Sequence, residues 1–291
     1  MSTSTSIGWS TGWTVEQPAK IGFVDVPAGE GNWETGLRAH FEYRDLGLAN
    51  ASDGMFSAKH IRVVEGAAGE LNTGWHCHDV DMQFFYVLKG WVKIRTEDGE
   101  VTLRAGDSGY QPPLYFHEET VCSPDYELFE ITCPAEVKTI HGRESELPAR
   151  AADLDPSRKP VYTRDVDENY VVGNGPRDFF AYRDLGTRDP TGGRVHLHTV
   201  AMAGGRGNDE GTGWHYHSMA QWFYILEGKA DLRVENGTRR HLVPGDAVCI
   251  GSGPNMRHFV GPISGDYKLV EMCVPANYDT ITVDAPEGAA R

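Results

Sequence analysis

The sequence predicts an all-β chain of two tandem domains, residues 1–145 and 146–291. Three observations support this fold class: an internal repeat, short strand-like segments between turn residues, and no amphipathic helix longer than about two turns. A chain of 291 residues is also the size expected for two domains of ~100–200 residues each.

The repeat covers most of both halves at a nearly constant offset of 138 to 141 residues. Five blocks of the first half recur in order, namely Phe41–Gly47, Thr73–His78, Gln83–Gly90, Gly106–Asp107 and Cys133–Ala135. Their counterparts are Phe180–Gly186, Thr212–His217, Gln221–Gly228, Gly245–Asp246 and Cys273–Ala276. We therefore expect a duplicated domain, with a linker in the Glu-, Pro- and Arg-rich stretch from His141 to Pro160.

The predicted strands are β-branched and aromatic, with Gly, Pro, Asp and Asn between them. In the first half they are Phe84–Leu88, Trp91–Arg95, Val101–Leu103 and Leu128–Thr132, and in the second Trp222–Leu226, Ala230–Val234 and Leu269–Cys273. Short strands at this spacing indicate an antiparallel sandwich or barrel in each half.

Charge and cysteine content narrow the class of protein. The formal net charge of −15 disfavours binding to nucleic acid or to an anionic membrane. Five widely spaced cysteines predict a reduced protein without disulfides. The segment Met1–Thr14 lacks the basic start and apolar run of a signal peptide, and no apolar run approaches ~18 residues, so we expect a cytoplasmic protein that does not enter a membrane.

Each half carries a set of three histidines and one glutamine in the same order. The sets are His76, His78, Gln83 and His117, and His215, His217, Gln221 and His258. Two histidines at i and i+2 of a strand share one face, and imidazole with an amide oxygen suits Fe(II), Mn(II), Co(II), Ni(II), Cu(II) or Zn(II). A single His-x-His pair is more often structural or at the surface, but here the whole set occurs twice. The sequence predicts one divalent transition metal per domain.

These motifs resemble those of the cupin superfamily, Gly-x5-His-x-His-x3-4-Glu-x6-Gly and Gly-x5-Pro-x-Gly-x2-His-x3-Asn. In the first half, His76, His78, Gln83 and Gly90 fit the first motif, and Gly106, Pro112 and His117 fit the second. In the second half, His215, His217, Gln221 and Gly228 fit the first motif, and Gly245 and His258 fit the second with two extra residues between them. The resemblance covers roughly residues 40–135 and 179–275 and implies two tandem double-stranded β-helix, or jelly-roll, barrels with the metal inside.

The departures from the motifs bear on the site. Gln83 and Gln221 stand in place of the usual Glu, which leaves a divalent site with a charge of +2 rather than +1 and makes it a stronger Lewis acid. Alternatively, each glutamine only donates a hydrogen bond and the site has three ligands. Leu114 and Asn255 fall at the Gly of the second motif, counted back from the histidine, so the loop before His117 is expected to differ in shape.

Several aromatic side chains near the histidines predict a mostly apolar pocket. They are Trp75, Tyr110, Tyr115 and Phe116 in the first half, and Trp214, Trp222, Tyr224 and Met256 in the second. Strand parity turns Phe84, Tyr86, Trp222 and Tyr224 away from the metal, so they should pack on another sheet, on a second barrel or on a partner. Ordinary core packing is the alternative for each aromatic. We expect a homo-oligomer.

Lys59 and His198 occupy matching strand positions and are the candidate catalytic residues. Either side chain could bind a carboxylate or move a proton if it points into the pocket, and the alternative is a solvated strand residue. Cys77 lies between two ligands and faces away from them, so we expect it to be structural.

The resemblance implies an enzyme acting on a small molecule. Gentisate-, salicylate- and quercetin-type cupin dioxygenases, oxalate decarboxylases and the bicupin isomerase of bacilysin biosynthesis share the fold, and the last is similar in having three His and a Gln in each barrel. A non-haem dioxygenase that uses Fe(II) and O2 on an oxygenated aromatic or diketone-like substrate is the leading expectation. A non-redox isomerase, decarboxylase or lyase, or a binding protein with structural metals, is the alternative.

Overall fold

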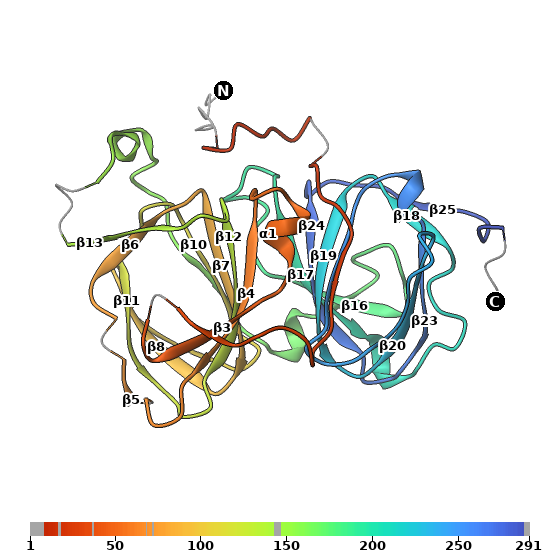
Figure 1. Cartoon of the computed structure of the whole chain (residues 1–291), viewed down its shortest axis with the longest axis horizontal. Coiled ribbons are helices and arrows are strands. Elements are labelled where there is room, and N and C mark those ends of the chain that lie inside the picture. The colour runs from red at the N-terminus through yellow and green to blue at the C-terminus, as the bar shows by residue number, and fades with distance from the viewer. Residues whose placement is uncertain are drawn as a thin grey trace. The chain divides into compact units, whose positions relative to one another are not determined.

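A computed structural model describes residues 9–16, 19–36, 38–67, 69–71, 73–142 and 147–287, and it is almost entirely β (Figure 1). The chain forms two compact units. The first contains Gly31–Ala49 and Asp53–Asp165 together with the N-terminal residues up to Thr14, and the second contains Val15–Glu30, Asn50–Ser52 and Val166–Arg291. Each unit has two antiparallel sheets, as a jelly-roll barrel requires.

The first unit is built from a seven-stranded and a six-stranded sheet. In order across the larger sheet, the strands are β14 (Val161–Thr163), β10 (Ser108–Gln111), β7 (Met82–Lys89), β12 (Glu127–Cys133), β4 (Ser57–Val63), β3 (Phe41–Asp45) and β2 (Glu34–Thr35). The smaller sheet has β13 (Lys138–His141), β6 (His76–Asp79), β11 (His117–Cys122), β8 (Trp91–Thr96) and β9 (Gly99–Arg104), with β5 (Gly69–Glu70) paired to β11.

The second unit repeats this arrangement. Its seven-stranded sheet has β1 (Val24–Val26), β22 (Ala247–Ile250), β19 (Ala220–Glu227), β24 (Lys268–Val274), β17 (His196–Met202), β16 (Phe180–Asp184) and β15 (Val171–Val172). Its five-stranded sheet has β21 (Arg239–Leu242), β20 (Ala230–Val234), β23 (His258–Ile263), β18 (His215–His217) and β25 (Thr280–Thr282). The predicted all-β fold is confirmed.

Helices are short in the part of the chain that the structure describes. They are α1 (Leu48–Ala51) and the 3-10 segments η2 (Ala149–Asp153), η3 (Asp167–Asn169), η4 (Ala203–Gly205) and η5 (Pro254–Met256). Within these described residues, no helix is long and apolar enough to cross a membrane.

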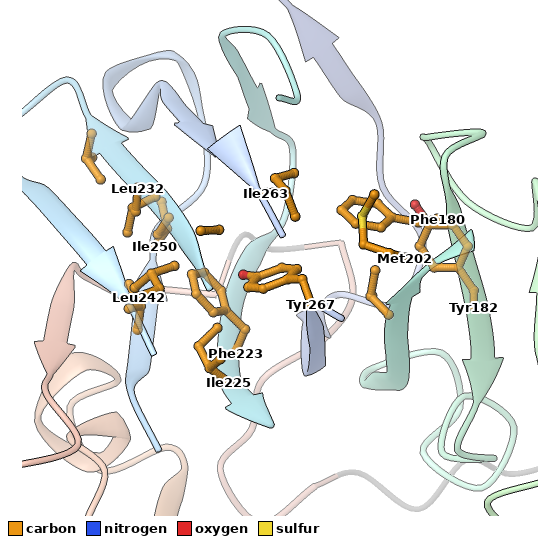
Figure 2. Close-up of a cluster of buried hydrophobic side chains, with 14 residues drawn as sticks. Phe180, Tyr182, Met202, Phe223, Ile225, Leu232, Leu242, Ile250, Ile263 and Tyr267 are labelled. Atoms are coloured by element: carbon orange, nitrogen blue, oxygen red, sulfur yellow. The ribbon is translucent and has the colours of Figure 1, made fainter. Parts of the chain in front are cut away.

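Strand alternation places the core inside each barrel. In the first unit, Phe85 and Val87 of β7 pack with Ile61, Leu103 and Leu128. In the second, Phe223 and Ile225 of β19 pack with Val200, Leu232 and Tyr267 (Figure 2). Gln83 and Gln221 share the parity of these residues, so their side chains also face the barrel interior.

The units divide the chain differently from the predicted boundary at residues 145 and 146, which lies outside the described residues. Residues up to Asp165 belong to the first unit because β14 pairs with β10 and Arg164 forms an ion pair with Asp107. Val15–Glu30 belongs to the second unit because β1 pairs with β22. These pairings join distant parts of the sequence and leave no local pattern.

The cysteines and the outward-facing aromatics are buried in the single chain. All five cysteines are free and buried, and Cys77 packs with Leu114, Phe116 and Ile140. Phe84 and Trp222 are 0% exposed and Tyr86 is 2% exposed. The chain itself therefore covers the aromatics that suggested an oligomer, and the oligomeric state stays a prediction without their support.

Candidate metal centres and their cavities

The first histidine group comes from two neighbouring strands of the smaller sheet. His76 and His78 stand two residues apart on β6, and His117, the first residue of β11, pairs directly with His76. The ring centroid of His117 lies 4.5 Å from that of His76 and 5.3 Å from that of His78. One ring nitrogen of each lies within 4.8 Å of the others. The structure therefore brings the three predicted histidines together.

Hydrogen bonds to the outer ring nitrogens orient these side chains. Nδ1 of His76 lies 2.7 Å from the carbonyl oxygen of Gly74, and Nδ1 of His117 lies 2.9 Å from that of Tyr115. Because a carbonyl oxygen only accepts, Nδ1 carries the proton and Nε2 keeps its lone pair. Nδ1 of His78 lies 3.1 Å from the Thr139 hydroxyl. Burial lowers the pKa of His76 to about 3 and that of His117 to about 4, so both rings are neutral near pH 7.

The second histidine group has the same construction. His215 pairs directly with His258 across β18 and β23, and the ring centroids of these two lie 4.2 Å apart. Nδ1 of His215 lies 2.9 Å from the Gly213 carbonyl oxygen, and Nδ1 of His217 lies 2.9 Å from the Thr280 hydroxyl. Nδ1 of His258 lies 2.9 Å from the Met256 carbonyl oxygen.

Both groups fit a divalent transition metal. Three neutral imidazoles that offer Nε2 are typical ligands for such an ion, and an outer hydrogen bond at Nδ1 is the usual way in which a protein fixes a ligating histidine. Burial lowers the pKa of all six rings, and for His215 it reaches about 3. The ligands therefore do not have to lose a proton at neutral pH before they bind the ion.

Gln83 and Gln221 line the same two cavities but have different neighbours. The amide nitrogen of Gln83 donates a hydrogen bond of 2.7 Å to Oε2 of Glu130 on β12, which leaves its amide oxygen free for another partner. The amide nitrogen of Gln221 lies 2.9 Å from Nε2 of His258. Ligation by either glutamine remains a prediction, and Gln83 has its amide already oriented by a carboxylate.

A polar cavity of about 490 Å³ surrounds the first histidine group. Nη2 of Arg38 lies 3.2 Å from Nε2 of His76, and Nη1 of Arg38 donates to the Thr73 carbonyl oxygen. Lys59, Glu119 and Glu130 also line this cavity. Burial raises the pKa of Glu119 to about 7 and raises that of Glu130. Cationic and carboxyl side chains thus meet at the first candidate metal centre.

The cavity at the second histidine group is much smaller, at about 80 Å³, and mostly apolar. Phe180, Tyr182, Phe223, Tyr267 and Tyr278 are its aromatic lining residues. Val260 stands at the position that Glu119 has in the first unit, two residues after the third histidine. The two centres therefore share their histidines but differ in size and charge.

A cupin-domain family matches the chain twice, at residues 62–123 and 202–270. Protein Ylba from E. coli has a similar structure, with a TM-score of 0.58 and 15% identity over 90% of this chain and 94% of that one. Oxalate decarboxylase from Bacillus subtilis is also similar, with a TM-score of 0.56 and 15% identity over 89% of this chain and 78% of that one. No curated protein has a matching sequence.

The chain is a bicupin. Each match spans the histidine motif of one unit together with the strands that carry it, and the similar structures extend over both units. The resemblance inferred from the motifs is therefore confirmed for the fold.

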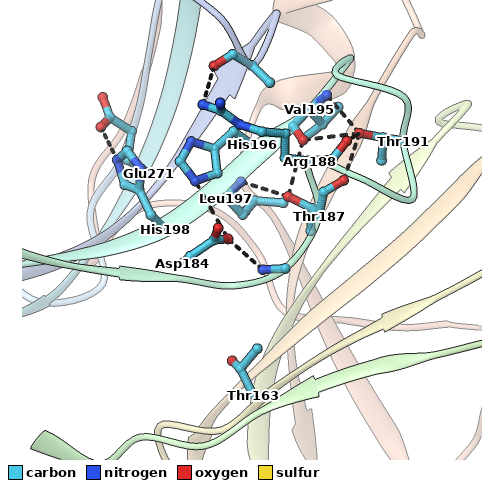
Figure 3. A network of polar contacts seen from close by, with 12 residues as sticks. Thr163, Asp184, Thr187, Arg188, Thr191, Val195, His196, Leu197, His198 and Glu271 are labelled. Atoms are coloured by element: carbon cyan, nitrogen blue, oxygen red, sulfur yellow. Dashed lines mark hydrogen bonds and ion pairs between the residues drawn. The ribbon is translucent and has the colours of Figure 1, made fainter. Parts of the chain in front are cut away.

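The two predicted catalytic residues of the bicupin have different surroundings. Lys59 lines the cavity of the first histidine group, and its side chain is exposed. Nε2 of His198 lies 2.7 Å from Oε2 of Glu271 (Figure 3). His198 also lines a separate open cavity of about 800 Å³. A role for Lys59 in binding substrate stays a prediction, whereas His198 lies outside the cavity of the second histidine group.

The aromatic lining predicted from the sequence is wrong for the first centre. Trp75 stacks on Phe116 with Arg95 over its ring, and the Tyr115 hydroxyl donates to Asp98, so none of these rings lines the cavity. The cavity of the second centre is aromatic, but other residues form it. Aromatic residues close to the histidines in the sequence did not predict the lining, because the cavity walls come from strands that are distant in the chain.

The loops before the third histidines correct one alignment. Leu114 takes a positive φ of 54°, and its N–H donates to the His78 carbonyl oxygen at 3.0 Å. In the second barrel Gly253, with a φ of 92°, makes the same bond to His217 at 2.8 Å. Gly253, not Asn255, is thus the counterpart of Leu114, and the two extra residues follow it. Leu114 therefore adopts the positive φ that a glycine has at this point of the second barrel.

Sequence reasoning missed two pairs of charged residues in the bicupin. Arg38 and Arg177 each line a histidine cavity and stand equally far ahead of the first histidine. Glu130 and Glu271 pair across the sheet with Lys59 and His198. Both pairs recur in the repeat, so a comparison of the halves outside the motif blocks could have found them.

Proposed function

We propose that this bicupin is a metal-dependent enzyme that binds a small carboxylate in the cavity of the first histidine group and converts it by decarboxylation, elimination or isomerisation. The observation that carries the proposal is the position of Arg38, whose guanidinium reaches the ring of His76 inside a polar cavity of about 490 Å³. A guanidinium next to a metal centre suits a carboxylate that contacts both. The second cavity is too small and apolar for the same task.

Each lining residue has a task that follows from its chemistry. Arg38 is held by the Thr73 carbonyl oxygen and can turn its other nitrogen from His76 to a substrate carboxylate. Lys59 adds a second cation at the exposed side of the cavity. Glu119 lines the same cavity from β11. Its carboxyl group could protonate the substrate carbon from which a group departs, or its carboxylate could remove a proton from a substrate carbon. A divalent ion held by the three histidines would polarise a carbonyl or carboxylate oxygen of the substrate.

The metal of the proposal is Mn(II) or Fe(II). A structure of the B. subtilis oxalate decarboxylase concerns its Mn(II) centres, and imidazole ligands accept either ion. The decarboxylase named in that comparison acts on a small dicarboxylate, which is the substrate class that Arg38 and Lys59 would bind.

A non-haem dioxygenase is the second candidate. It is favoured by the donor set of three neutral imidazoles, which leaves coordination positions open for a substrate oxygen and O2. The charged first cavity is less suited to the aromatic or diketone-like substrate that such an enzyme would cleave.

Turnover of a panel of small carboxylates, with CO2 release and O2 uptake recorded together, tests the proposal. We expect conversion without net O2 consumption, and we expect Arg38→Gln to raise KM on the order of tenfold or more, since one ion pair near ε ~20 is worth a few kcal/mol. Arg177→Gln, the matched change in the other barrel, should have a much smaller effect. Stoichiometric O2 uptake would establish the dioxygenase instead, and equal effects of the two substitutions would contradict turnover in the first barrel.

A further inference from the structure

The cavities around the two histidine groups differ in how far they extend from the histidines. In the first unit one cavity extends from the three histidines to Lys59 and Asp45. In the second unit the cavity at the histidines is about 80 Å³, and a separate, more open pocket of about 800 Å³ lies beside it at His198. Four residues line both of these cavities, namely Pro176, Arg177, Tyr278 and Thr280.

Only one of these four has a clearly larger side chain than a described counterpart. Arg177 and Thr280 match Arg38 and Thr139 in the repeat, and the counterpart of Pro176 lies outside the described residues. Tyr278 matches Val137, which lines the first cavity. A phenol ring thus stands in the second barrel where the first has an isopropyl group.

Contacts on both sides hold the Tyr278 ring in place. It lies edge-on to His217, with the ring centroids 5.7 Å apart and the planes at 89°. Its hydroxyl forms a hydrogen bond with the thiol of Cys273 on β24. Strand pairing makes Thr132, and not the Cys133 of the repeat block, the counterpart of Cys273, because Thr132 pairs with Gln83 as Cys273 pairs with Gln221. Tyr278 matches Val137, so the first barrel lacks both members of this contact.

We propose that Tyr278 closes the second metal site to all but very small ligands, and that Val137 leaves the first site open to an organic substrate. A cavity of about 80 Å³ has room for two or three waters, since each water takes about 30 Å³ in the liquid. Water or an ion of two or three atoms such as azide fits there, whereas an aromatic diolate does not. Tyr278 is therefore a selectivity residue for access to the second centre, independent of the reaction at the first.

Ligand binding to Co(II) in the full-length chain tests this without any assay of turnover. The His76→Ala variant keeps a complete histidine set only in the second barrel, and His215→Ala keeps one only in the first. Each is loaded with Co(II), its cobalt content is measured, and its visible spectrum is titrated with azide and with 4-nitrocatechol. We expect azide to bind in both variants, and the catecholate to bind only where the first site is loaded.

Substitutions at Tyr278 and Val137 should then exchange the ability of the two sites to bind the catecholate. Added to His76→Ala, Tyr278→Val should admit the catecholate, whereas Tyr278→Phe, which keeps the ring and loses the hydrogen bond to Cys273, should still exclude it. Added to His215→Ala, Val137→Tyr should weaken catecholate binding at least tenfold and leave azide binding unchanged.

Two results would overturn the proposal. The first is catecholate binding to the second site in the His76→Ala variant with Tyr278 intact. The second is continued exclusion in Tyr278→Val while its cobalt content and thermal unfolding match those of Tyr278→Phe. Admission by Tyr278→Phe as well would assign the barrier to the hydrogen bond and not to the ring.

Discussion

At the scale of single residues, hydrogen bonds prepare the ligands before any ion arrives. Each of the six histidines uses Nδ1 for a hydrogen bond to a carbonyl or hydroxyl group, so Nε2 is the nitrogen that can bind an ion. Nε2 of His76 lies 3.2 Å from Arg38, and Nε2 of His258 lies 2.9 Å from Gln221. Burial keeps the rings neutral, and no carboxylate belongs to either histidine group. Charge at the first centre comes from side chains beyond the histidines, above all Arg38 and Glu130.

The neighbour of Gln83 explains why a glutamate would be unfavourable there. Its amide nitrogen donates to the Glu130 carboxylate at 2.7 Å, and a carboxylate at that position could not donate. Without metal, Gln83→Glu would place two buried carboxyl groups side by side, which we expect to lower the free energy of unfolding by about 2 kcal/mol or more. Gln221→Glu, next to the His258 ring, should cost clearly less.

Denaturant unfolding of both variants in the presence of a chelator measures this difference. With metal bound, the added charge at Gln83 should also reduce turnover, because it weakens the attraction of the centre for an anionic substrate. Equal stability of the two metal-free variants would show that Glu130 does not determine the choice of glutamine.

At the scale of elements, the loop that leads into β11 stores strain at one residue. Leu114 has a φ of 54° and is 0% exposed, so it combines an unfavourable backbone conformation with a buried side chain. Leu114→Ala and Leu114→Gly should each cost about 2–4 kcal/mol through loss of the side chain. The glycine variant should be the more stable of the two by about 1 kcal/mol, because glycine accepts positive φ without strain.

Leu103 of β9 is the matched control. It is also 0% exposed but is not among the described residues with positive φ. There the order should reverse, with Leu103→Gly less stable than Leu103→Ala, as is usual inside a strand. Thermal unfolding of the four variants decides the matter, and the same order at both positions would contradict strain at Leu114.

Glu127, the first residue of the central strand β12, joins three strands of the larger sheet in the first barrel. Its carboxylate lies 3.0 Å from His60 on β4 and 2.8 Å from Lys89 on β7, and the hydrogen bond from His60 lowers the pKa of Glu127 to about 2. A carboxyl group with a lowered pKa stabilises the fold fully above its unfolded pKa of ~4.3, and this contribution disappears as the pH falls through about 2.

Glu127→Gln should therefore lower the free energy of unfolding by about 1–2 kcal/mol at neutral pH, after allowance for solvent screening. The difference from the unsubstituted chain should shrink between pH 4.3 and about 2. Glu100, whose exposed carboxylate lies 3.8 Å from Lys93, is the control, and Glu100→Gln should change little at any pH. A pH-independent difference for Glu127→Gln would contradict the ion-pair account.

At the scale of the whole molecule, the repeat predicted the architecture and the histidines but not the cavities. His76 and His215 could be found because strand parity and motif spacing are local properties of the sequence. Arg38 and Glu130 were missed because their distance from the histidines depends on pairing between strands remote in the chain. The difference between Val137 and Tyr278 is visible in the aligned halves, but its effect on cavity size appears only when the side chains are packed.

The boundary between the units shows the same limit. β14 and β1 each complete the edge of a seven-stranded sheet, and each lies far in sequence from the strand it pairs with. Composition could indicate a linker between His141 and Pro160, but it could not assign these edge strands to a barrel.

Metal content of the reconstituted chain tests the central claim, that each barrel holds an ion through its own three histidines. After removal of metal and reconstitution with Mn(II) or Fe(II), we expect one ion per histidine group, two in the unsubstituted chain. His76→Ala and His215→Ala should each lose one ion and keep the other, and the double variant should bind none tightly. A single ion in the unsubstituted chain, or retention of both ions in either variant, would contradict the account.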